Sequence, residues 1–370
     1  MSPHVSPSSP LRVALVGYGL AGAAFHAPLI ATTPGLRLHS VVTANAGRRA
    51  ALRADHPDAR IVADTDQLLA AADELDLVVV ASPDHTHVPV ARAALAAGLP
   101  VVVDKPLAAS TAEARALVQE ARRRDLMLTV FQNRRWDADF LTARRLIADG
   151  RLGAVHRFES RFERWQPEVK PGWRQSAAAA ATGGVLFDLG SHLVDQALQL
   201  FGPVERVHAE VDTRRSGAQV DDDAFLALTH TGGVRSHLWM GALAGLPGPR
   251  LRVLGDRAAY TAPRLDPQED ALRAGHRPGP GWGTVPEADH GTLGAGPDAR
   301  PHPSLPGDYP AFYAGVAAAL RDGAPVPVDP LDAVATLTVL EAARHSAATG
   351  RTVGLRDTGV GSLTATESPA

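Results

Sequence analysis

The chain has 370 residues, of which 45% are hydrophobic and 21% charged, the balance of a globular protein long enough for two domains. Its net charge of −3 and the lack of any block of five basic residues speak against nucleic-acid binding. Without cysteine or an apolar run of about 18 residues, disulfides and thiol catalysis are excluded and no membrane span is expected.

Residues 1–10, MSPHVSPSSP, are rich in serine and proline and are expected to be disordered. They show neither the basic region nor the apolar stretch of a signal peptide, so the cytoplasm is the expected location.

From residue 11 onward, short apolar stretches alternate with helical patterns. Strands are predicted over 11–17, 36–43, 73–82, 100–104 and 126–133, and helices over 65–73, 89–98 and 111–124. Near-continuous apolar strands that alternate with helices are typical of a parallel sheet covered on both faces. We therefore predict an α/β domain over residues 11–131.

The pattern changes after residue 131. Helices are predicted over 137–150, 183–202, 309–323 and 330–350, and strands over 154–165, 204–215, 222–240 and 249–262. Consecutive strands joined by tight turns indicate an open, mostly antiparallel sheet. We therefore predict an α+β domain over residues 132–356, whose closing helices either stay with it or pack back on the first domain.

Two segments lack a periodic pattern. Residues 357–370 are expected to form a disordered tail. Residues 264–307 hold many prolines and glycines, and a long irregular stretch of this kind forms a lid, a subunit contact or plain surface.

A glycine-rich turn follows the first predicted strand. Gly17, Gly19 and Gly22 form a GxGxxG pattern, in which the first glycine permits a tight turn, the second lets a pyrophosphate approach and the third lets helix and strand pack. This context predicts a Rossmann domain that binds a dinucleotide, although a turn needed only for packing remains the alternative. The predicted cradle consists of Gly17, Tyr18, Gly19, Leu20, Ala21 and Gly22.

The helix after this turn contains Pro28, so we expect a short first helix and a second one that begins near this proline. His26 then lies at the break. It is either a site residue at the cofactor end of the sheet or a capping or core histidine.

The second predicted strand ends without an acidic residue. NAD-binding versions of the fold use an acid there to bind the ribose 2′-hydroxyl. Here Thr43 lies at the strand end and Asn45 just beyond it, and Arg48 and Arg49 can pair with a 2′-phosphate. We therefore expect NADP rather than NAD, unless the two arginines only form a solvated helix start.

Two further strands end at the edge where ligands bind in such sheets. Ser82, Pro83 and His87 follow one of them and are predicted to contact the cofactor. Lys105 follows the other and either points at cofactor and substrate or lies solvated at the surface. His85 and His87 have no third ligand nearby in the sequence, so no metal site is expected.

The predicted helix 183–202 carries a polar stripe among apolar residues. Asp188, His192, Asp195 and Gln199 are spaced four, three and four residues apart and share one face of a helix. By itself this stripe is a metal-binding site, a set of catalytic acid and base residues, or a row of polar residues inside a hydrophobic core.

Three stretches in order resemble the glucose–fructose oxidoreductase, inositol dehydrogenase and rhizopine catabolism (Gfo/Idh/MocA) family: VGYGLAGAAFHAPLI, ASPDHTHVPVARAALAAGLPVVVDKPLA and GGVLFDLGSHLVDQALQLFG. The resemblance spans residue 11 to about residue 350. NRRWDADFLTARRLI, GWR and DPQE resemble the subgroup of NADP-dependent scyllo-inositol dehydrogenases. The chain departs from the family at Asp104, where the family usually has glutamate before the lysine and proline.

The resemblance implies a catalytic set of Lys105, Asp188 and His192. A histidine suits the proton of a secondary alcohol, a lysine stabilises charge on the same oxygen, and Asp188 binds a neighbouring hydroxyl or biases the histidine. Asp195 is either structural or a substrate contact. Arg135, Trp165, Trp173 and Arg174 are candidates for a polyol pocket, with core packing or surface stacking as the alternative.

These residues predict an NADP-dependent oxidoreductase of a cyclic polyol or sugar, assembled as a homodimer or homotetramer. A keto-sugar reductase on the same scaffold, a nucleotide-sensing regulator without catalysis and, remotely, a metal hydrolase are the alternatives.

Overall fold

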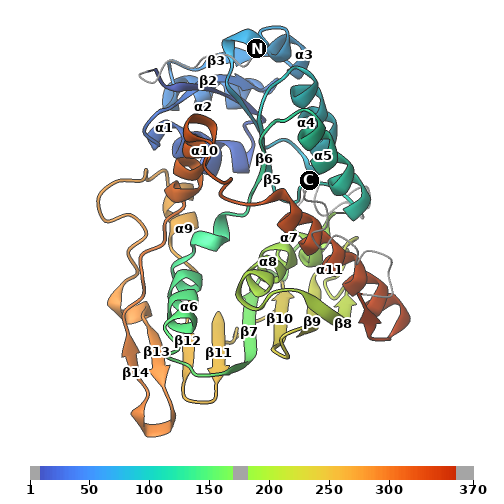
Figure 1. Cartoon of the computed structure of the whole chain (residues 1–370), viewed down its shortest axis with the longest axis vertical. Coiled ribbons are helices and arrows are strands. Elements are labelled where there is room, and N and C mark those ends of the chain that lie inside the picture. The colour runs from blue at the N-terminus through green and yellow to red at the C-terminus, as the bar shows by residue number, and fades with distance from the viewer. Residues whose placement is uncertain (1–8, 170–181, 356–370) are drawn as a thin grey trace, which may run out of the picture. The chain divides into compact units, whose positions relative to one another are not determined.

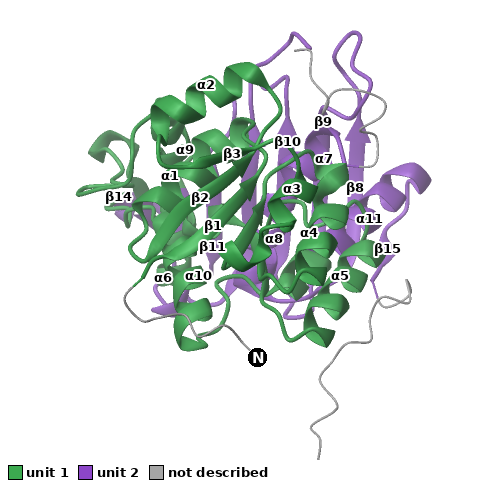
Figure 2. Cartoon of the chain, turned by 90° about the horizontal axis from the view of Figure 1, so that it is seen from above, with its two compact units in different colours: residues 1–146, 262–291, 301–335 green, residues 147–261, 292–300, 336–370 purple. Residues whose placement is uncertain are grey.

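The computed structural model describes residues 9–169 and 182–355. Contacts between residues divide the chain into two compact units (Figure 2). Unit 1 consists of residues 1–146, 262–291 and 301–335, and unit 2 of residues 147–261, 292–300 and 336–370. The chain passes between the units several times, and the predicted domain limits after residues 131 and 356 stay predictions.

Unit 1 contains a six-stranded sheet. Its strands are β1 (Leu11–Val16), β2 (Leu36–Val42), β3 (Arg60–Val62), β4 (Leu77–Val80), β5 (Val101–Asp104) and β6 (Leu128–Phe131). They follow the order β3-β2-β1-β4-β5-β6 and all pair in parallel. This is the strand order of a doubly wound dinucleotide-binding sheet, with its switch point between β1 and β4. The predicted parallel sheet is therefore confirmed, and only β3 has no counterpart among the predicted strands.

Three helices of unit 1 begin at side chains that accept hydrogen bonds from the first helical turn. Asn45 caps α2, Asp64 caps α3 and Ser110 caps α5. The helices are α1 (Ala27–Thr32), α2 (Ala46–Asp55), α3 (Thr65–Leu69), α4 (His87–Ala96), α5 (Thr111–Arg123), α6 (Ala138–Ala148), α9 (Gln268–Arg273) and α10 (Pro310–Asp322). A π-helical turn over Ala21–His26 runs directly into α1, in whose first turn Pro28 lies, as the proline predicts.

Unit 2 is built on a second sheet (Figure 1). Its strands are β7 (Val155–Glu163), β8 (Val204–Asp212), β9 (Asp223–His230), β10 (Arg235–Gly241), β11 (Leu251–Gly255), β12 (Ala259–Ala262), β13 (Gly291–Gly294), β14 (Arg300–His302) and β15 (Val353–Gly354). The order is β14-β13-β12-β11-β7-β10-β9-β8-β15. The sheet is mixed, because β7 and β10 pair in parallel while β10–β9, β9–β8 and β11–β7 are antiparallel.

One face of this sheet is covered by helices. They are α7 (Gly184–Asp188), α8 (Gly190–Phe201) and α11 (Pro330–Thr349). Helix α8 lies on β7 and β10, and α7 lies on β9 and β10 (Figure 1). Gly190 allows close packing, since a Cβ atom there would lie 2.9 Å from the sulfur of Met240 on β10.

The irregular segment 264–307 contains one short helix, α9, and two short strands, β13 and β14. Gln268 ties the start of this segment to its surroundings, since its Oε1 accepts from the Tyr309 amide at 2.7 Å and from Trp282 Nε1 at 2.7 Å. Glu269 forms an ion pair with Arg134. The DPQE sequence thus ties parts of unit 1 that are distant along the chain.

The unfolding free energy is expected to depend on pH through Asp266. Its buried carboxylate accepts bonds from the amides of Ala138 and Gln268. Burial nevertheless raises its pKa from the usual 3.8 to about 6. Because the folded state holds the proton more tightly, this stabilising contribution is complete below pH 3.8 and is lost as the pH rises through 6.

The measurement is urea unfolding of the protein and of Asp266→Asn at several pH values. The unfolding free energy of the protein should fall relative to that of the variant by about 2 kcal/mol between pH 4 and pH 7. A difference that stays constant over this range would contradict the prediction.

Candidate active site

Two glycines of the turn after β1 are required by the packing of the chain itself. Gly17 has φ +102°, and a Cβ atom on it would lie 2.6 Å from the carbonyl oxygen of Ala81. A Cβ atom on Gly22 would lie 2.1 Å from the carbonyl oxygen of Gly17. Both positions therefore exclude a side chain whether or not a ligand is bound.

Gly19 is different, because space lies beside it. The nearest atoms to a Cβ atom there belong to the guanidinium of Arg48, 3.9 Å away. The absent side chain leaves the backbone open next to a cation, which is what a dinucleotide pyrophosphate needs in order to approach this turn. The residues of the turn therefore fit the predicted cofactor.

The other residues of the predicted cradle differ in exposure. The Tyr18 side chain is buried, and burial raises its pKa to about 12 although Arg277 opposes this. Leu20 is exposed and Ala21 begins the π-helical turn. The buried Tyr18 side chain therefore packs within the protein.

The end of β2 and the start of α2 bring Thr43, Arg48 and Arg49 together. Asn45 accepts from the amide of Arg48 at 3.0 Å, which begins the helix. Arg49 Nε donates to the carbonyl oxygen of Thr43 at 2.9 Å, whereas the Arg48 side chain is exposed. Arg48 therefore lies beside the glycine turn, in the first turn of the helix that follows β2, while Arg49 reaches the end of β2.

At the ends of β4 and β5, hydrogen bonds hold the loops. Ser82 Oγ lies 2.5 Å from Thr86 Oγ1, and Pro83 is exposed. His87 is buried, with Nδ1 2.8 Å from the carbonyl oxygen of Pro106 and Nε2 2.9 Å from that of Ser82. His87 thus connects the two strand ends through its ring.

Lys105 follows β5 directly and is partly exposed. Its backbone amide donates to Oδ1 of Asp104 at 2.8 Å. Burial raises the pKa of Asp104, but His26, His87 and Lys105 oppose it and leave this pKa below its usual value. Asp104 is therefore a buried carboxylate whose ionised form is stabilised by the neighbouring His26, His87 and Lys105.

His26 lies in the core of unit 1 and makes no side-chain capping bond. Its ring is fully buried, 4.4 Å from the Phe131 ring between centroids, and its Nδ1 lies 2.6 Å from Tyr313 Oη. Nε2 lies 3.8 Å from Oδ2 of Asp104. Of the two interpretations that the sequence left open, the core position is correct, although the ring also reaches the residue before Lys105.

The prediction of one helix over residues 183–202 is wrong, because the segment is divided at Leu189 into two helices, α7 and α8. Asp221 begins α7: its Oδ2 accepts from the Leu186 amide at 2.8 Å, and a side chain at Gly184 would collide with its carboxylate. A partly buried carboxylate far along the chain thus decides where this helix starts.

The break separates the members of the polar stripe. Asp188 is the last residue of α7 and is partly exposed, and its carbonyl oxygen accepts from Ser191 Oγ at 3.3 Å. His192 and Asp195 are buried on α8, whereas Gln199 is exposed. Leu189 keeps right-handed helical angles, so the backbone continues the helical path through the break, but exposure differs along the stripe.

The predicted substrate residues are distributed over both units. Arg135 is buried in unit 1 and pairs with Asp332 at 3.0 Å. Trp165 of unit 2 is 62% exposed and forms a β-bridge with Leu243. Trp173 and Arg174 lie outside the described residues.

The predicted catalytic residues also come from two units. Lys105 belongs to unit 1, and Asp188 and His192 belong to unit 2. Within residues 9–169 and 182–355, no three His, Asp or Glu side chains gather into a metal-binding group. In the same residues no helix is both long and apolar enough to cross a membrane.

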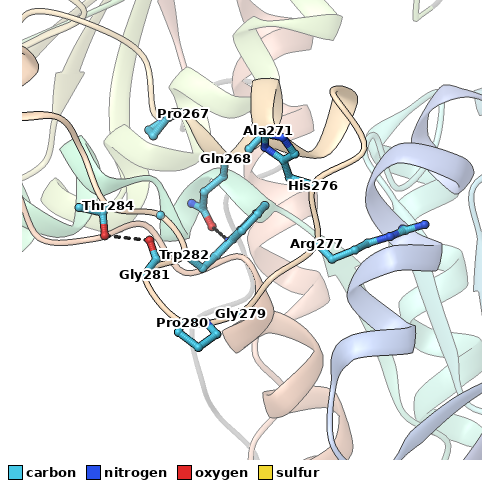
Figure 3. A pocket seen from close by; sticks show the side chains of 11 residues that line it. Pro267, Gln268, Ala271, His276, Arg277, Gly279, Pro280, Gly281, Trp282 and Thr284 are labelled. Atoms are coloured by element: carbon cyan, nitrogen blue, oxygen red, sulfur yellow. Dashed lines mark hydrogen bonds between the residues drawn. The ribbon is translucent and has the colours of Figure 1, made fainter.

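A cavity of about 320 Å³ lies beside α9 in unit 1 (Figure 3). Trp282 and Gln268 form part of its wall and are joined by a hydrogen bond, while the Arg277 side chain extends toward a neighbouring helix (Figure 3). None of the described residues predicted for the site lines this cavity. We therefore do not place the candidate active site there.

Sequence reasoning missed three features of this region: the contact of His26 with Asp104, the partnership of His26 with Tyr313, and the proximity of Arg48 to Gly19. Tyr313 is 287 residues away from His26, so no local pattern links them. Only the apolar surroundings of His26 in FHAPLI signalled burial.

Comparison with known proteins places the chain among oxidoreductases. Residues 11–132 match an oxidoreductase family with an NAD-binding Rossmann fold, and residues 140–261 match the GFO/IDH/MocA C-terminal domain. The chain is 34% identical to scyllo-inositol 2-dehydrogenase (NADP(+)) IolW of Bacillus subtilis, covering 93% of this chain and 96% of that protein.

Other relatives are similar over nearly the whole chain. The uncharacterized oxidoreductase YdgJ of Escherichia coli is 38% identical, with 92% of this chain and 97% of that protein covered. A putative oxidoreductase of Yersinia pestis superposes with a TM-score of 0.87 at 39% identity, covering 94% of this chain and 97% of that one. The chain is therefore an oxidoreductase with an NAD-binding Rossmann domain, and it belongs to the Gfo/Idh/MocA family.

Proposed function

We propose that the protein is an NADP-dependent oxidoreductase that interconverts a secondary alcohol and a ketone on a cyclic polyol or sugar, with inositol-type substrates favoured. The observation that carries the cofactor choice is the position of Arg48, whose guanidinium lies beside Gly19 and which belongs to the helix that follows the acid-free β2. The similarity to an NADP-dependent scyllo-inositol dehydrogenase supports the substrate class.

Each predicted catalytic residue has a distinct task in this proposal. When bound, NADP supplies the hydride acceptor. His192 takes the proton of the substrate hydroxyl, and Lys105 stabilises the negative charge that develops on the same oxygen. Asp188 holds a neighbouring hydroxyl or biases the protonation of His192. In the direction of ketone reduction, His192 returns the proton.

The direct test follows absorbance at 340 nm with NADP or NAD across a panel of inositols, other polyols and sugars. Turnover of scyllo-inositol or myo-inositol with NADP supports the proposal. Turnover only in the direction of ketone reduction, with open-chain or keto-sugars, would favour the reductase alternative. Tight nucleotide binding without turnover of any substrate would favour the regulator, and NADP-linked turnover that persists in EDTA would dispose of the metal hydrolase.

Replacing Arg48 with alanine is expected to lower the preference for NADP over NAD. Loss of a charge-assisted contact with a 2′-phosphate costs about 1.5–3 kcal/mol, so the ratio of kcat/KM values should fall about 10- to 100-fold. Arg53→Ala is the matched control, because Arg53 is an exposed arginine in the last turn of the same helix. An unchanged ratio, or a native preference for NAD, would refute the role of Arg48.

The proposed homo-oligomer is supported by the face of the second sheet that points away from α8. Phe225, His237 and Trp239 form an aromatic cluster on β9 and β10, with the Arg161 guanidinium 3.9 Å from the Trp239 ring. Side chains alternate along β10, so Trp239 points to the face opposite Met240, the residue that packs under Gly190 of α8. An aromatic cluster on an open sheet face suits an interface between copies of the chain.

Trp239→Glu is expected to convert the oligomer to a monomer, because it places a charge within this cluster. Light scattering coupled to gel filtration measures the mass, and Trp239→Phe should leave the oligomer intact. A protein that is monomeric at micromolar concentration without any substitution would contradict the proposal.

A further inference from the structure

Lys105 lies between two residues that are each held by a buried histidine. Asp104 precedes it and Pro106 follows it. His26 comes from the π-helical turn after β1, and His87 is the first residue of α4. Both rings are almost completely buried in unit 1, so neither is available as a surface group.

The first histidine acts on Asp104. His26 Nε2 lies 3.8 Å from Oδ2 of Asp104, while Oδ1 of the same carboxylate accepts from the Lys105 amide at 2.8 Å. Tyr313 fixes the opposite side of the ring, with its Oη 2.6 Å from Nδ1. One carboxylate therefore connects the His26 ring to the backbone of Lys105.

The second histidine acts on Pro106. His87 Nδ1 lies 2.8 Å from the carbonyl oxygen of Pro106, and Nε2 lies 2.9 Å from that of Ser82. A carbonyl oxygen only accepts hydrogen bonds, so the ring nitrogen is the donor in each of these contacts. The ring then joins the peptide after Lys105 to the peptide that follows β4.

We infer that His26 and His87 are positioning residues for Lys105: through Asp104 and the Pro106 carbonyl they hold the backbone on both sides of the lysine. This inference deepens the proposed function and rests on the role of Lys105 in it. The Asp104 carboxylate, shorter by one methylene than the glutamate usual in the family, makes the contact with His26 sensitive to where that ring lies.

Asparagine and glutamine variants separate the two hydrogen bonds of His87, and the hydrogen bond of His26 with Tyr313 from its 3.8 Å contact with Asp104. The amide of asparagine reaches the position of Nδ1, and that of glutamine reaches the position of Nε2. His87→Asn thus keeps a donor for Pro106 and His87→Gln keeps one for Ser82. In the same way, His26→Gln keeps a hydrogen-bond donor facing Asp104 and loses the bond to Tyr313. His26→Asn keeps the bond to Tyr313 and loses the contact with Asp104.

The mobility of Lys105 can be measured without any substrate. Lys105 and Lys170 are the only two lysines of the chain, so Lys170→Arg leaves Lys105 as the only one. Reductive methylation with ¹³C-formaldehyde then gives one lysine signal besides that of the N-terminus. We expect this signal to shift or broaden in His87→Gln and His26→Asn, and to stay close to the parent signal in His87→Asn and His26→Gln.

The matched control is His230→Gln. His230 is likewise buried with both ring nitrogens bonded, to the Gly202 carbonyl and to Ser236, but it lies in unit 2 and outside the candidate site. Its substitution should lower stability and leave the Lys105 signal unchanged. If a histidine variant does not fold, Tyr313→Phe removes only the hydroxyl that holds His26 and should still shift the signal. A Lys105 signal that is the same in all folded variants overturns the inference.

Kinetics separate this inference from the proposed function. With scyllo-inositol and NADP, kcat should fall about 10- to 100-fold in His87→Gln and His26→Asn, and less in their partner variants. In a Lys105→Met background the same substitutions should have no further effect on kcat, because they act through the lysine. Full effects in that background overturn the positioning role. Unimpaired turnover by Lys105→Met itself refutes the proposed role of the lysine, while the ¹³C signal still tests the positioning.

Discussion

His192→Ala is expected to lower kcat by about two to four orders of magnitude, because the substrate hydroxyl loses its proton acceptor. His192 is buried near the start of α8, directly after the break at Leu189, so its ring is held by the packed helix rather than by a surface loop. The affinity for NADPH should change little, because the proposed phosphate contacts come from the glycine turn and Arg48 and not from His192. Steady-state rates and fluorescence titration with NADPH measure the two quantities.

A matched control is His208→Ala, a histidine of β8 in the same unit whose side chain is 40% exposed. It should keep normal turnover. A His192→Ala variant that folds and turns over at a near-normal rate would remove this histidine as the proton acceptor and leave Asp188 as the next candidate, which Asp188→Asn would test.

Gly19→Ala is expected to weaken NADPH binding about 10- to 100-fold while leaving the melting temperature nearly unchanged. The added methyl group meets no protein atom closer than the Arg48 guanidinium at 3.9 Å, so the folded chain accommodates it. It occupies instead the space through which a pyrophosphate approaches the backbone. Fluorescence titration gives the affinity, and thermal unfolding without nucleotide gives the stability.

Gly22→Ala provides the contrast. Its methyl group would lie 2.1 Å from the Gly17 carbonyl oxygen, so it strains the turn itself. We expect the melting temperature without nucleotide to fall by about 3–10 °C, since overpacking costs about 1–3 kcal/mol. If Gly19→Ala bound NADPH normally, the space beside Gly19 would not be the pyrophosphate site.

Much of the first sheet could be predicted, because its strands and the starts of its helices are determined by residues close together in the sequence. The buried strands are runs of valine and leucine, and capping residues mark several helix starts. The three-residue strand β3 was missed because RIV is too short to show a period. In segment 264–307 the elements α9, β13 and β14 were missed for the same reason.

The candidate site likewise combines features that the sequence predicts with one that it does not. Its residue types could be named from the sequence: a glycine turn, arginines after an acid-free strand, a lysine at a strand end, and an aspartate and a histidine four residues apart. The start of α7 could not be predicted, because it depends on Asp221, which accepts a hydrogen bond from the Leu186 amide 35 positions away along the chain.

The sequence by itself determined the alternation of strands and helices, the dinucleotide turn and the chemistry of the candidate residues, because each depends on neighbours within a few positions. Only the tertiary structure decided which residues contact one another. Arg48 lies beside Gly19, and His26 lies between Tyr313 and Asp104. These contacts join residues that are distant along the chain, and their distances follow from the packing of the whole unit.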